Sequence, residues 1–219
     1  CWMKIGLIDV DGHHYPNLAL MKLSAWHKAQ GDEVEWWWGW GQYDRVYMSK
    51  VFDETYSPDI PEPVNAAEII KGGTGYGLDS KLPDEIEHIY PDYSLYPSLT
   101  KDTAYGFLTR GCPRGCHFCI VAAKEGRKSV KVADLSEWWN GQKNIVLMDP
   151  NILACPQHME LLGQLADSKA WVDINQGLDC RLLTKQNIET INRVKLREIH
   201  FAWDYMKESK AVLRGLELY

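Results

Sequence analysis

Three cysteines in one short segment, Cys112, Cys116 and Cys119, are the residues of this chain best suited to chemistry. Their C-x3-C-x2-C spacing lets three thiolates from a single loop bind three corners of a cubic iron–sulfur cluster. The fourth iron of such a cluster has no protein ligand and is open to a small molecule. The spacing therefore predicts a metal site at which a reaction takes place.

The cysteines are predicted to follow a strand. Residues 103–109 have the pattern of a short buried strand, and Gly111, Pro113 and Gly115 allow the backbone to turn tightly between the cysteines. The cysteines would then lie beyond the carboxyl end of a strand, where α/β proteins commonly place their reactive groups.

With the aromatic Phe118 directly before the last cysteine, the segment resembles the signature of the radical S-adenosylmethionine (radical SAM) enzymes. The resemblance implies that Cys112, Cys116 and Cys119 bind a four-iron, four-sulfur (4Fe-4S) cluster, and it places Phe118 in the cofactor site. It also implies that the amino and carboxylate groups of S-adenosylmethionine (SAM) chelate the fourth iron. Reductive cleavage of SAM would then give methionine and a 5'-deoxyadenosyl radical that abstracts hydrogen from a substrate.

Other uses of the cysteines stay open. A structural zinc site would need a fourth ligand such as His117, although zinc sites usually combine two separated ligand pairs. A disulfide framework is disfavoured because three of the six cysteines share one loop and no secretory signal is recognised, so a cytoplasmic protein is expected. Cys155 and Cys180 are expected to pack in the core, with an auxiliary cluster or a hydrogen-atom relay as the alternative.

Charge and composition limit the partners of the chain. No apolar run reaches the roughly 20 residues that span a bilayer, so no membrane partner is expected. The net charge of −6 disfavours nucleic acid, whose phosphates call for a broad cationic surface. Three roles are open for the locally basic residues 124–131. They are contact with an anionic substrate, contact with an acidic electron donor, and simple exposure to solvent.

The resemblance implies a reductant such as flavodoxin or ferredoxin, and a substrate that no motif identifies. The tryptophan-rich residues 36–40 are predicted to pack in the core or at a domain interface. A subunit contact in a homo-oligomer is the alternative.

The first part of the chain is predicted to be an α/β domain with a parallel, Rossmann-like sheet. The pattern places a helix at residues 18–30 and strands at residues 4–10, 32–38, 43–52 and 67–71. Residues 1–76 form this predicted domain, and residues 77–102, which contain three prolines, form a predicted linker.

Residues 1–76 resemble the cobalamin-binding domain that precedes the radical core in one branch of the family. The resemblance rests on Asp11 and His13 after the first strand, on Ser49 after a later strand, and on the pair Gly72-Gly73. Pro16 stands where the family has glycine, and it would obstruct the nucleotide tail of the cofactor. Cobalamin is therefore a secondary expectation, which Pro16 disfavours.

Residues 103–219 are predicted to form a partial (β/α) barrel of about four strand–helix units. The pattern indicates helices at 132–140, 157–168 and 185–194, and further strands at 144–149, 171–175 and 198–203. A radical SAM core normally has six such units. We therefore expect either a barrel that a partner completes or a truncated part of a longer chain.

Polar residues follow each of these predicted strands. By the resemblance, the end of the second strand meets the methionyl amino group of SAM, which assigns Asp149 and Asn151 to that contact. Asn175, Gln176 and Arg181 are candidates for ribose and carboxylate contacts, and Asp204 is a candidate on the substrate side. Each of them is also of a type that commonly caps helices or ends strands.

The resulting hypothesis is an enzyme that cleaves SAM reductively with a 4Fe-4S cluster. Two alternatives belong to other classes, a cobalamin-dependent radical SAM methyltransferase and a non-catalytic iron–sulfur binding module.

Overall fold

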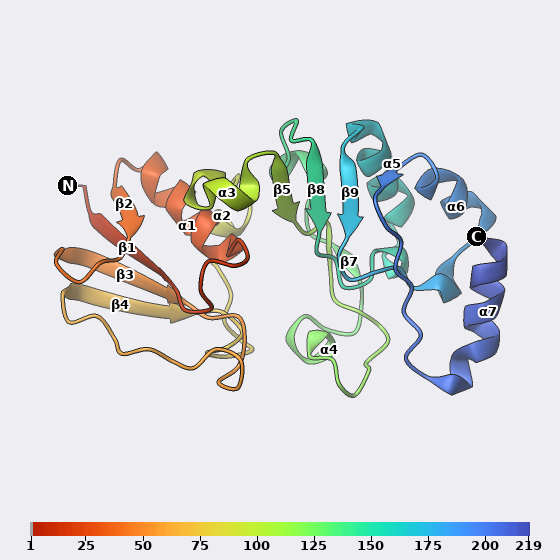
Figure 1. Ribbon diagram of the computed structural model, residues 1–219, viewed down its shortest axis with the longest axis horizontal. Helices are drawn as coiled ribbons and strands as arrows, with labels where there is room; N and C mark the ends of the chain where they lie inside the picture. The colour runs from red at the N-terminus through yellow and green to blue at the C-terminus, as the bar shows by residue number, and fades with distance from the viewer. Residues whose placement is uncertain (1) are drawn as a thin grey trace. The chain divides into compact units, whose positions relative to one another are not determined.

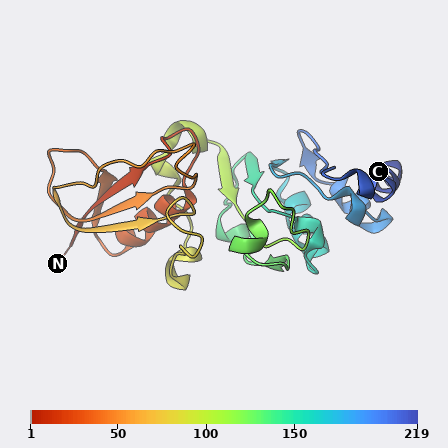
Figure 2. The same cartoon turned by 90° about the horizontal axis from the view of Figure 1, so that it is seen from below.

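The computed structural model describes residues 2–219 and divides into two compact units, one ending at Lys101 and one running from Asp102 to Tyr219. Cys1, the first residue of the predicted domain 1–76, lies outside the described residues. Each unit contains its own parallel sheet with helices packed against it (Figures 1 and 2). The predicted α/β fold class is therefore confirmed.

The first unit contains a four-stranded parallel sheet in the order β2-β1-β3-β4. Its strands are β1 (Lys4–Asp9), β2 (Glu33–Trp36), β3 (Tyr43–Ser49) and β4 (Ala66–Gly72). Helix α1 (Leu18–Ala29) begins at Asn17, whose side-chain oxygen accepts a hydrogen bond from the Leu20 amide at 3.1 Å. This cap satisfies one of the free amides of the first helical turn.

The central strand β1 is buried on both faces of the sheet, which is why it is almost continuously apolar. One face packs through Ile5 and Leu7 against Leu20 and Leu23 of α1. The other face, with Ile8, Val46 and Met48 in its core, is covered by partly buried side chains that include Trp37 and Tyr76.

The tryptophan-rich segment divides between the interior and the surface. Trp36 and Trp37 pack against the two core clusters, whereas Trp38 is 50% exposed and Trp40 is 89% exposed. Short helices follow at α2 (Asp84–Glu87), η1 (Tyr93–Leu95) and α3 (Pro97–Thr100), inside the segment predicted as a linker.

The second unit is built on a parallel sheet in the order β10-β9-β8-β5. Its strands are β5 (Thr103–Gly106), β8 (Asn144–Leu147), β9 (Trp171–Ile174) and β10 (Lys195–Leu196), and a small antiparallel hairpin pairs β6 (Thr109–Arg110) with β7 (Val130–Lys131). Its helices are α4 (Val121–Lys124), η2 (Leu135–Glu137), η3 (Ile152–Ala154), α5 (His158–Ser168), η4 (Cys180–Leu182), α6 (Lys185–Ile191), η5 (Met206–Glu208) and α7 (Ser209–Leu218). In Figure 1, β5, β8 and β9 lie side by side and point toward the loop that carries α4.

Two predicted elements of this unit are wrong. Residues 132–140 contain only the short turn η2, because the amides of Val132 and Ala133 donate to the Leu108 carbonyl at 2.8 and 3.4 Å and so continue the hairpin. The strand predicted at 198–203 is reduced to a single bridge between Leu178 and Phe201, and β10 forms earlier at Lys195–Leu196.

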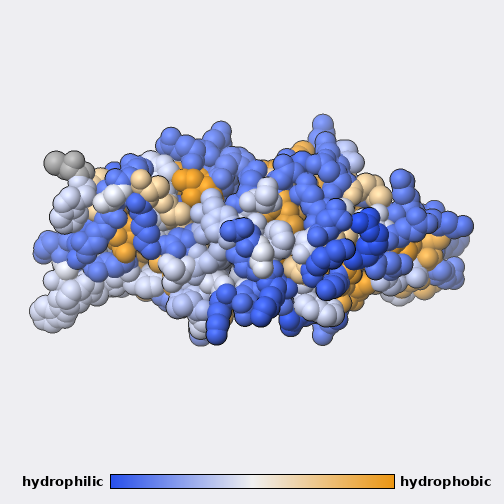
Figure 3. Space-filling model, turned by 90° about the horizontal axis from the view of Figure 1, so that it is seen from above, coloured by the Kyte–Doolittle hydropathy of each residue, from blue (hydrophilic) through white to orange (hydrophobic). Residues whose placement is uncertain are grey.

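Hydrophilic side chains cover most of the face of the molecule shown in Figure 3, with smaller separate hydrophobic patches. No helix within residues 2–219 is both long enough and apolar enough to cross a bilayer.

Two glycines with positive φ, Gly31 and Gly73, test the packing of the first unit. Gly73 has a φ of +97°, and a Cβ atom there would collide with the Lys50 carbonyl oxygen, whereas Gly31 has a φ of +87° with open space around it. We predict that Gly31→Ala costs about 1 kcal/mol of unfolding free energy, from backbone strain alone. Gly73→Ala should cost clearly more, because the collision adds to the strain. Urea denaturation of both variants measures the difference, and equal losses would contradict this account of the packing.

Candidate functional site

The cysteine loop, residues 111–120, connects β6 to α4 at the carboxyl end of the second sheet. Its base is closed by the pairing of β6 with β7 and by a hydrogen bond of 3.2 Å from the Cys112 amide to the Gly126 carbonyl. Gly111 has a φ of +85°, and a Cβ there would collide with the Lys128 carbonyl oxygen. Only glycine therefore lets the chain enter the loop at this point without strain.

All three thiols of the loop are free, with Cys112 and Cys116 half-buried and Cys119 exposed. The Cys119 amide donates to the Cys116 carbonyl at 3.0 Å. In the part of the chain that the structure describes, no three His, Cys, Asp or Glu side chains are arranged as a ready metal site. Three unpaired thiols on one glycine-rich loop nevertheless suit the donor set of a three-cysteine cluster, provided that binding draws them together.

An ion-pair network, formed by Arg114, Arg181, Asp179, Asp204 and Glu208, fastens the cysteine loop to later segments. Arg114, whose side chain is only 9% exposed, pairs with Asp204 at 2.7 Å and with Glu208 at 2.9 Å. Glu208 also pairs with Arg181, and Arg181 pairs with the buried Asp179 at 2.7 Å. One carboxylate thus links the cysteine loop to the loop that follows β9.

The segment that supplies Asp204 also contacts the cysteine loop directly. The Cys116 thiol donates to an Asp204 carboxylate oxygen at 3.8 Å, and His117 Nδ1 lies 3.2 Å from the Tyr205 hydroxyl. Burial raises the pKa of the Cys116 thiol. Cys116 is therefore a hydrogen-bonded thiol in this structure.

Asp149, which follows β8, binds the backbone just ahead of the cysteine loop. Its carboxylate accepts hydrogen bonds from the Leu108 amide at 2.7 Å, the Thr109 amide at 2.9 Å and the Thr109 hydroxyl at 2.7 Å. The side chain is 1% exposed, and burial raises its pKa to about 6. These bonds interrupt the predicted strand 103–109 and fix the position at which the loop begins. The contact of Asp149 with SAM stays a prediction, since both oxygens are occupied here.

Asn151 lies next to the first cysteine. Its side-chain nitrogen is 3.7 Å from the Cys112 sulfur and 3.3 Å from an Asp179 oxygen. The side-chain oxygen Oδ1 of Asn151 is buried, and it has no hydrogen-bond partner among the residues described. An unpaired buried acceptor is uncommon in a folded protein and calls for a donor.

The other predicted site residues occupy different environments. Phe118 is 61% exposed and contacts the His117 ring edge-on, with 5.2 Å between ring centroids. Asn175 and Gln176 are exposed just after β9, whereas the Arg181 guanidinium is already shared between two carboxylates. Contacts of these four residues with a cofactor remain predictions.

Sequence reasoning missed three residues that organise this region. Arg114 and Glu208 act through charge partners that lie far away in the sequence, whereas Asp179 pairs with Arg181 two positions further on. The one signal available was Arg114, a cation inside the cysteine motif that would need a counter-ion once buried.

In the first unit, the residues of the cobalamin resemblance are largely engaged by the chain itself. The Asp11 carboxylate accepts from the Val51 amide at 2.7 Å and from the Ser57 hydroxyl at 2.6 Å. The Ser49 hydroxyl accepts from the Asn17 amide group at 2.8 Å. His13 is exposed and packs on Trp36, with 4.2 Å between ring centroids. Of these side chains, His13 is the one that fits a ligand role without rearrangement.

Comparisons with known proteins agree with the cysteine motif. No protein-family model matches the chain. The tRNA-2-methylthio-N(6)-dimethylallyladenosine synthase of Pseudoalteromonas atlantica is 26% identical over 152 residues, which cover 65% of this chain and 31% of that protein. The chain therefore spans under a third of the length of this curated relative.

A solved structure matches the fold over nearly the whole chain. It is the radical S-adenosylmethionine methyltransferase TsrM from Kitasatospora setae, with cobalamin and a 4Fe-4S cluster bound. The match has a TM-score of 0.63 at 8% identity and covers 99% of this chain and 67% of that one. Together, the two matches confirm the resemblance to the radical SAM superfamily and the predicted fold class. They lend no support to the expectation that cobalamin is disfavoured.

Replacing Glu208 tests the ion-pair network. We predict that Glu208→Gln lowers the unfolding free energy of the second unit by about 1 to 3 kcal/mol, because two largely buried guanidinium groups lose a charged partner. Amide hydrogen exchange across residues 112–119 should become faster. Asp167→Asn is the matched control, since its pair with Arg193 is 60% and 73% exposed and should contribute less than about 1 kcal/mol. Equal effects of both variants would contradict a special role for Glu208.

The raised pKa of Asp149 predicts how the free energy of unfolding depends on pH. Because its pKa is raised to about 6, the folded chain binds more protons at this carboxyl than the unfolded chain between about pH 4 and pH 6. The free energy of unfolding should therefore fall as the pH rises through this range, by roughly 3 kcal/mol at about 1.4 kcal/mol for each pKa unit. Asp149→Asn cannot ionise and should lack this fall. Urea denaturation across the range compares the two proteins, and parallel curves would refute the assignment.

Proposed function

We propose that this chain, whose fold is that of a radical SAM methyltransferase, is itself a radical SAM enzyme that cleaves SAM reductively and acts on a substrate still to be identified. Cys112, Cys116 and Cys119 would hold a 4Fe-4S cluster, and the bound cluster would supply the electron for cleavage. Three free thiols on one loop at the carboxyl end of a parallel sheet support this proposal. Reduced flavodoxin or ferredoxin is the proposed electron donor.

The observation that carries the proposal is the unpaired oxygen of Asn151. This acceptor is buried beside Cys112, and leaving it without a donor costs about 1 to 3 kcal/mol. The amino group of SAM is a strong donor, and the family places it at the end of this strand. Asn151 would therefore orient the methionyl end of SAM next to the cysteine loop.

Other residues of the chain position this site. Asp149 fixes the backbone at Leu108 and Thr109, which determines where the cysteine loop leaves the sheet. Arg114 and Glu208 hold the middle of the loop against the segment that follows β9. Both anchors are independent of any bound metal, so the loop is placed before its ligands are assembled.

A cobalamin-dependent methyltransferase is a second candidate function. It is favoured by the match to TsrM, which binds cobalamin, and by the exposed imidazole of His13 at the end of β1. A stoichiometric corrinoid whose absorption spectrum changes in His13→Ala would support it. The Pseudoalteromonas relative is named for a tRNA product, but the net charge of −6 argues against carrying a nucleic-acid substrate over to this chain.

The cysteines give the main test of the proposal. After anaerobic reconstitution and reduction with dithionite, we expect the protein to release 5'-deoxyadenosine from SAM, measured by chromatography. Alanine at Cys112, Cys116 or Cys119 should abolish the product and lower bound iron at least severalfold. Cys180→Ala, which removes a buried thiol outside the loop, should keep both. A wild-type protein with bound iron and no 5'-deoxyadenosine would instead support a non-catalytic iron–sulfur module.

Asn151 gives a separate prediction about SAM affinity. We expect Asn151→Ala to raise the dissociation constant of SAM about tenfold, because one hydrogen bond to a charged group is worth about 1.5 to 3 kcal/mol. Asn144→Ala is the matched control, because Asn144 starts the strand that ends near Asn151. Equilibrium dialysis with labelled SAM measures both, and unchanged affinity in Asn151→Ala would remove this contact.

A further inference from the structure

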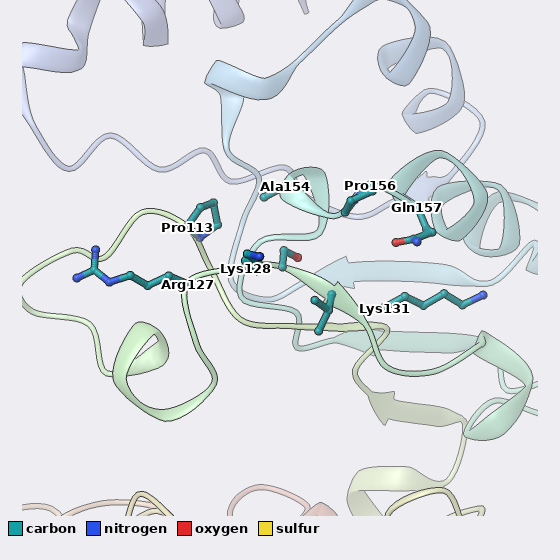
Figure 4. Close-up of a pocket in the computed structure, with 9 residues that line it drawn as sticks. Pro113, Arg127, Lys128, Lys131, Ala154, Pro156 and Gln157 are labelled. Carbon is teal, nitrogen blue, oxygen red and sulfur yellow. The ribbon is translucent and has the colours of Figure 1, made fainter.

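A cavity of about 430 Å³ lies beside the cysteine loop in the second unit (Figure 4). Three segments line it, namely Pro113 of the loop, residues 127–131 around β7, and Ala154, Pro156 and Gln157 ahead of α5. This volume falls in the range of about 300 to 1,000 Å³ that is typical of small-molecule sites. None of the predicted cofactor and metal residues lines it, whereas residues 127–131 belong to the basic segment for which an anionic substrate is one of the expectations.

The charged residues that line the cavity are all cations. Arg127, Lys128 and Lys131 contribute to the wall and no carboxylate does, although the chain as a whole carries a net charge of −6. In Figure 4, Arg127 and Lys131 extend to opposite sides while Lys128 lies between them. The local charge therefore favours an anionic occupant.

The three cations differ in their partners. Lys131 is neutralised by Asp134 and Glu160, each at 2.7 Å. Arg127 and Lys128 have no ion-pair partner anywhere in residues 2–219, and both are exposed. The Arg127 guanidinium packs against Gly115 of the cysteine loop, which places its charge near that loop. Lys128, which lies between the other two cations, is thus an unpaired charge in the wall of the cavity.

The opposite wall adds a second source of positive potential. Gln157, the residue before α5, makes no side-chain capping bond. The His158 amide donates to the Cys155 carbonyl at 3.0 Å, and the amides of Met159 and Glu160 have no partner among the described residues. Such helix starts attract anions, and phosphate most of all. Pro113, Val130, Ala154 and Pro156 give the rest of the wall an apolar surface. The wall therefore suits a ligand with a phosphate group and a less polar body.

The cavity is connected to the candidate SAM site by short contacts. Pro113 directly follows Cys112, and the Ser129 hydroxyl donates to the Asn151 carbonyl at 2.9 Å. An occupant of the cavity would thus contact Pro113, the neighbour of Cys112 in the sequence, and Ser129, which is hydrogen-bonded to Asn151.

We propose that this cavity binds the phosphate group of a small-molecule substrate, with Lys128 as its main charge partner. Calling the ligand a substrate rests on the proposed function, whereas phosphate binding itself does not. A phosphorylated small molecule, rather than a polymer, is inferred from the volume of the cavity and from the negative net charge of the chain.

The test is a titration of the full-length protein with inorganic phosphate and with glycerol 3-phosphate, followed by amide chemical shifts and by calorimetry. We expect saturable binding with shifts at residues 127–131 and 154–158. Lys128→Gln should weaken binding about tenfold, and Lys143→Gln, which removes an exposed lysine outside the cavity, should change it less than twofold.

Three results would overturn the proposal. They are the absence of saturable binding, equal weakening by both lysine variants, and tighter binding of a ten-residue oligothymidylate than of glycerol 3-phosphate. The titration uses no SAM and measures no turnover. Its failure is therefore distinct from a failure to release 5'-deoxyadenosine.

Discussion

Buried charges hold the cysteine loop, with its three free thiols, at the edge of the second sheet. Just ahead of the cysteine loop, the carboxylate of Asp149 accepts hydrogen bonds from two successive backbone amides where the chain leaves β5. Within the loop, the largely buried Arg114 side chain requires carboxylate partners. The loop itself is irregular, glycine-rich and partly exposed.

Buried charges fix the position of the loop because a buried charge without a partner is strongly destabilising. Removing one partner of a fully buried ion pair strands the other and typically costs about 3 to 5 kcal/mol, a large fraction of the roughly 5 to 15 kcal/mol by which a domain is stable, and a partly exposed pair costs less. Surface pairs such as Arg193 with Asp167 carry no such constraint. The network around Arg114 is therefore better understood as a device that fixes the geometry of the loop than as a source of net stability.

The fold class could be predicted from the sequence because it leaves a local pattern, and the cysteine motif that predicts the metal site is local as well. Ligand spacing within one loop and alternating strands and helices are visible in adjacent residues. The anchors could not be predicted in this way, since Arg114 and Glu208 are 94 positions apart and Thr109 and Asp149 are 40 apart. The failed helix at 132–140 has the same origin, because Val132 and Ala133 bond to Leu108, a residue whose proximity only the folded hairpin reveals.

The central claim is that Cys112, Cys116 and Cys119 hold a cluster with one iron open to SAM. Electron paramagnetic resonance of the reduced, reconstituted protein during a SAM titration tests it most directly. The account predicts a 4Fe-4S signal whose shape and g-values change with SAM and reach saturation at one equivalent. A signal that SAM leaves unaltered, or a protein that binds zinc and forms no cluster, would contradict it.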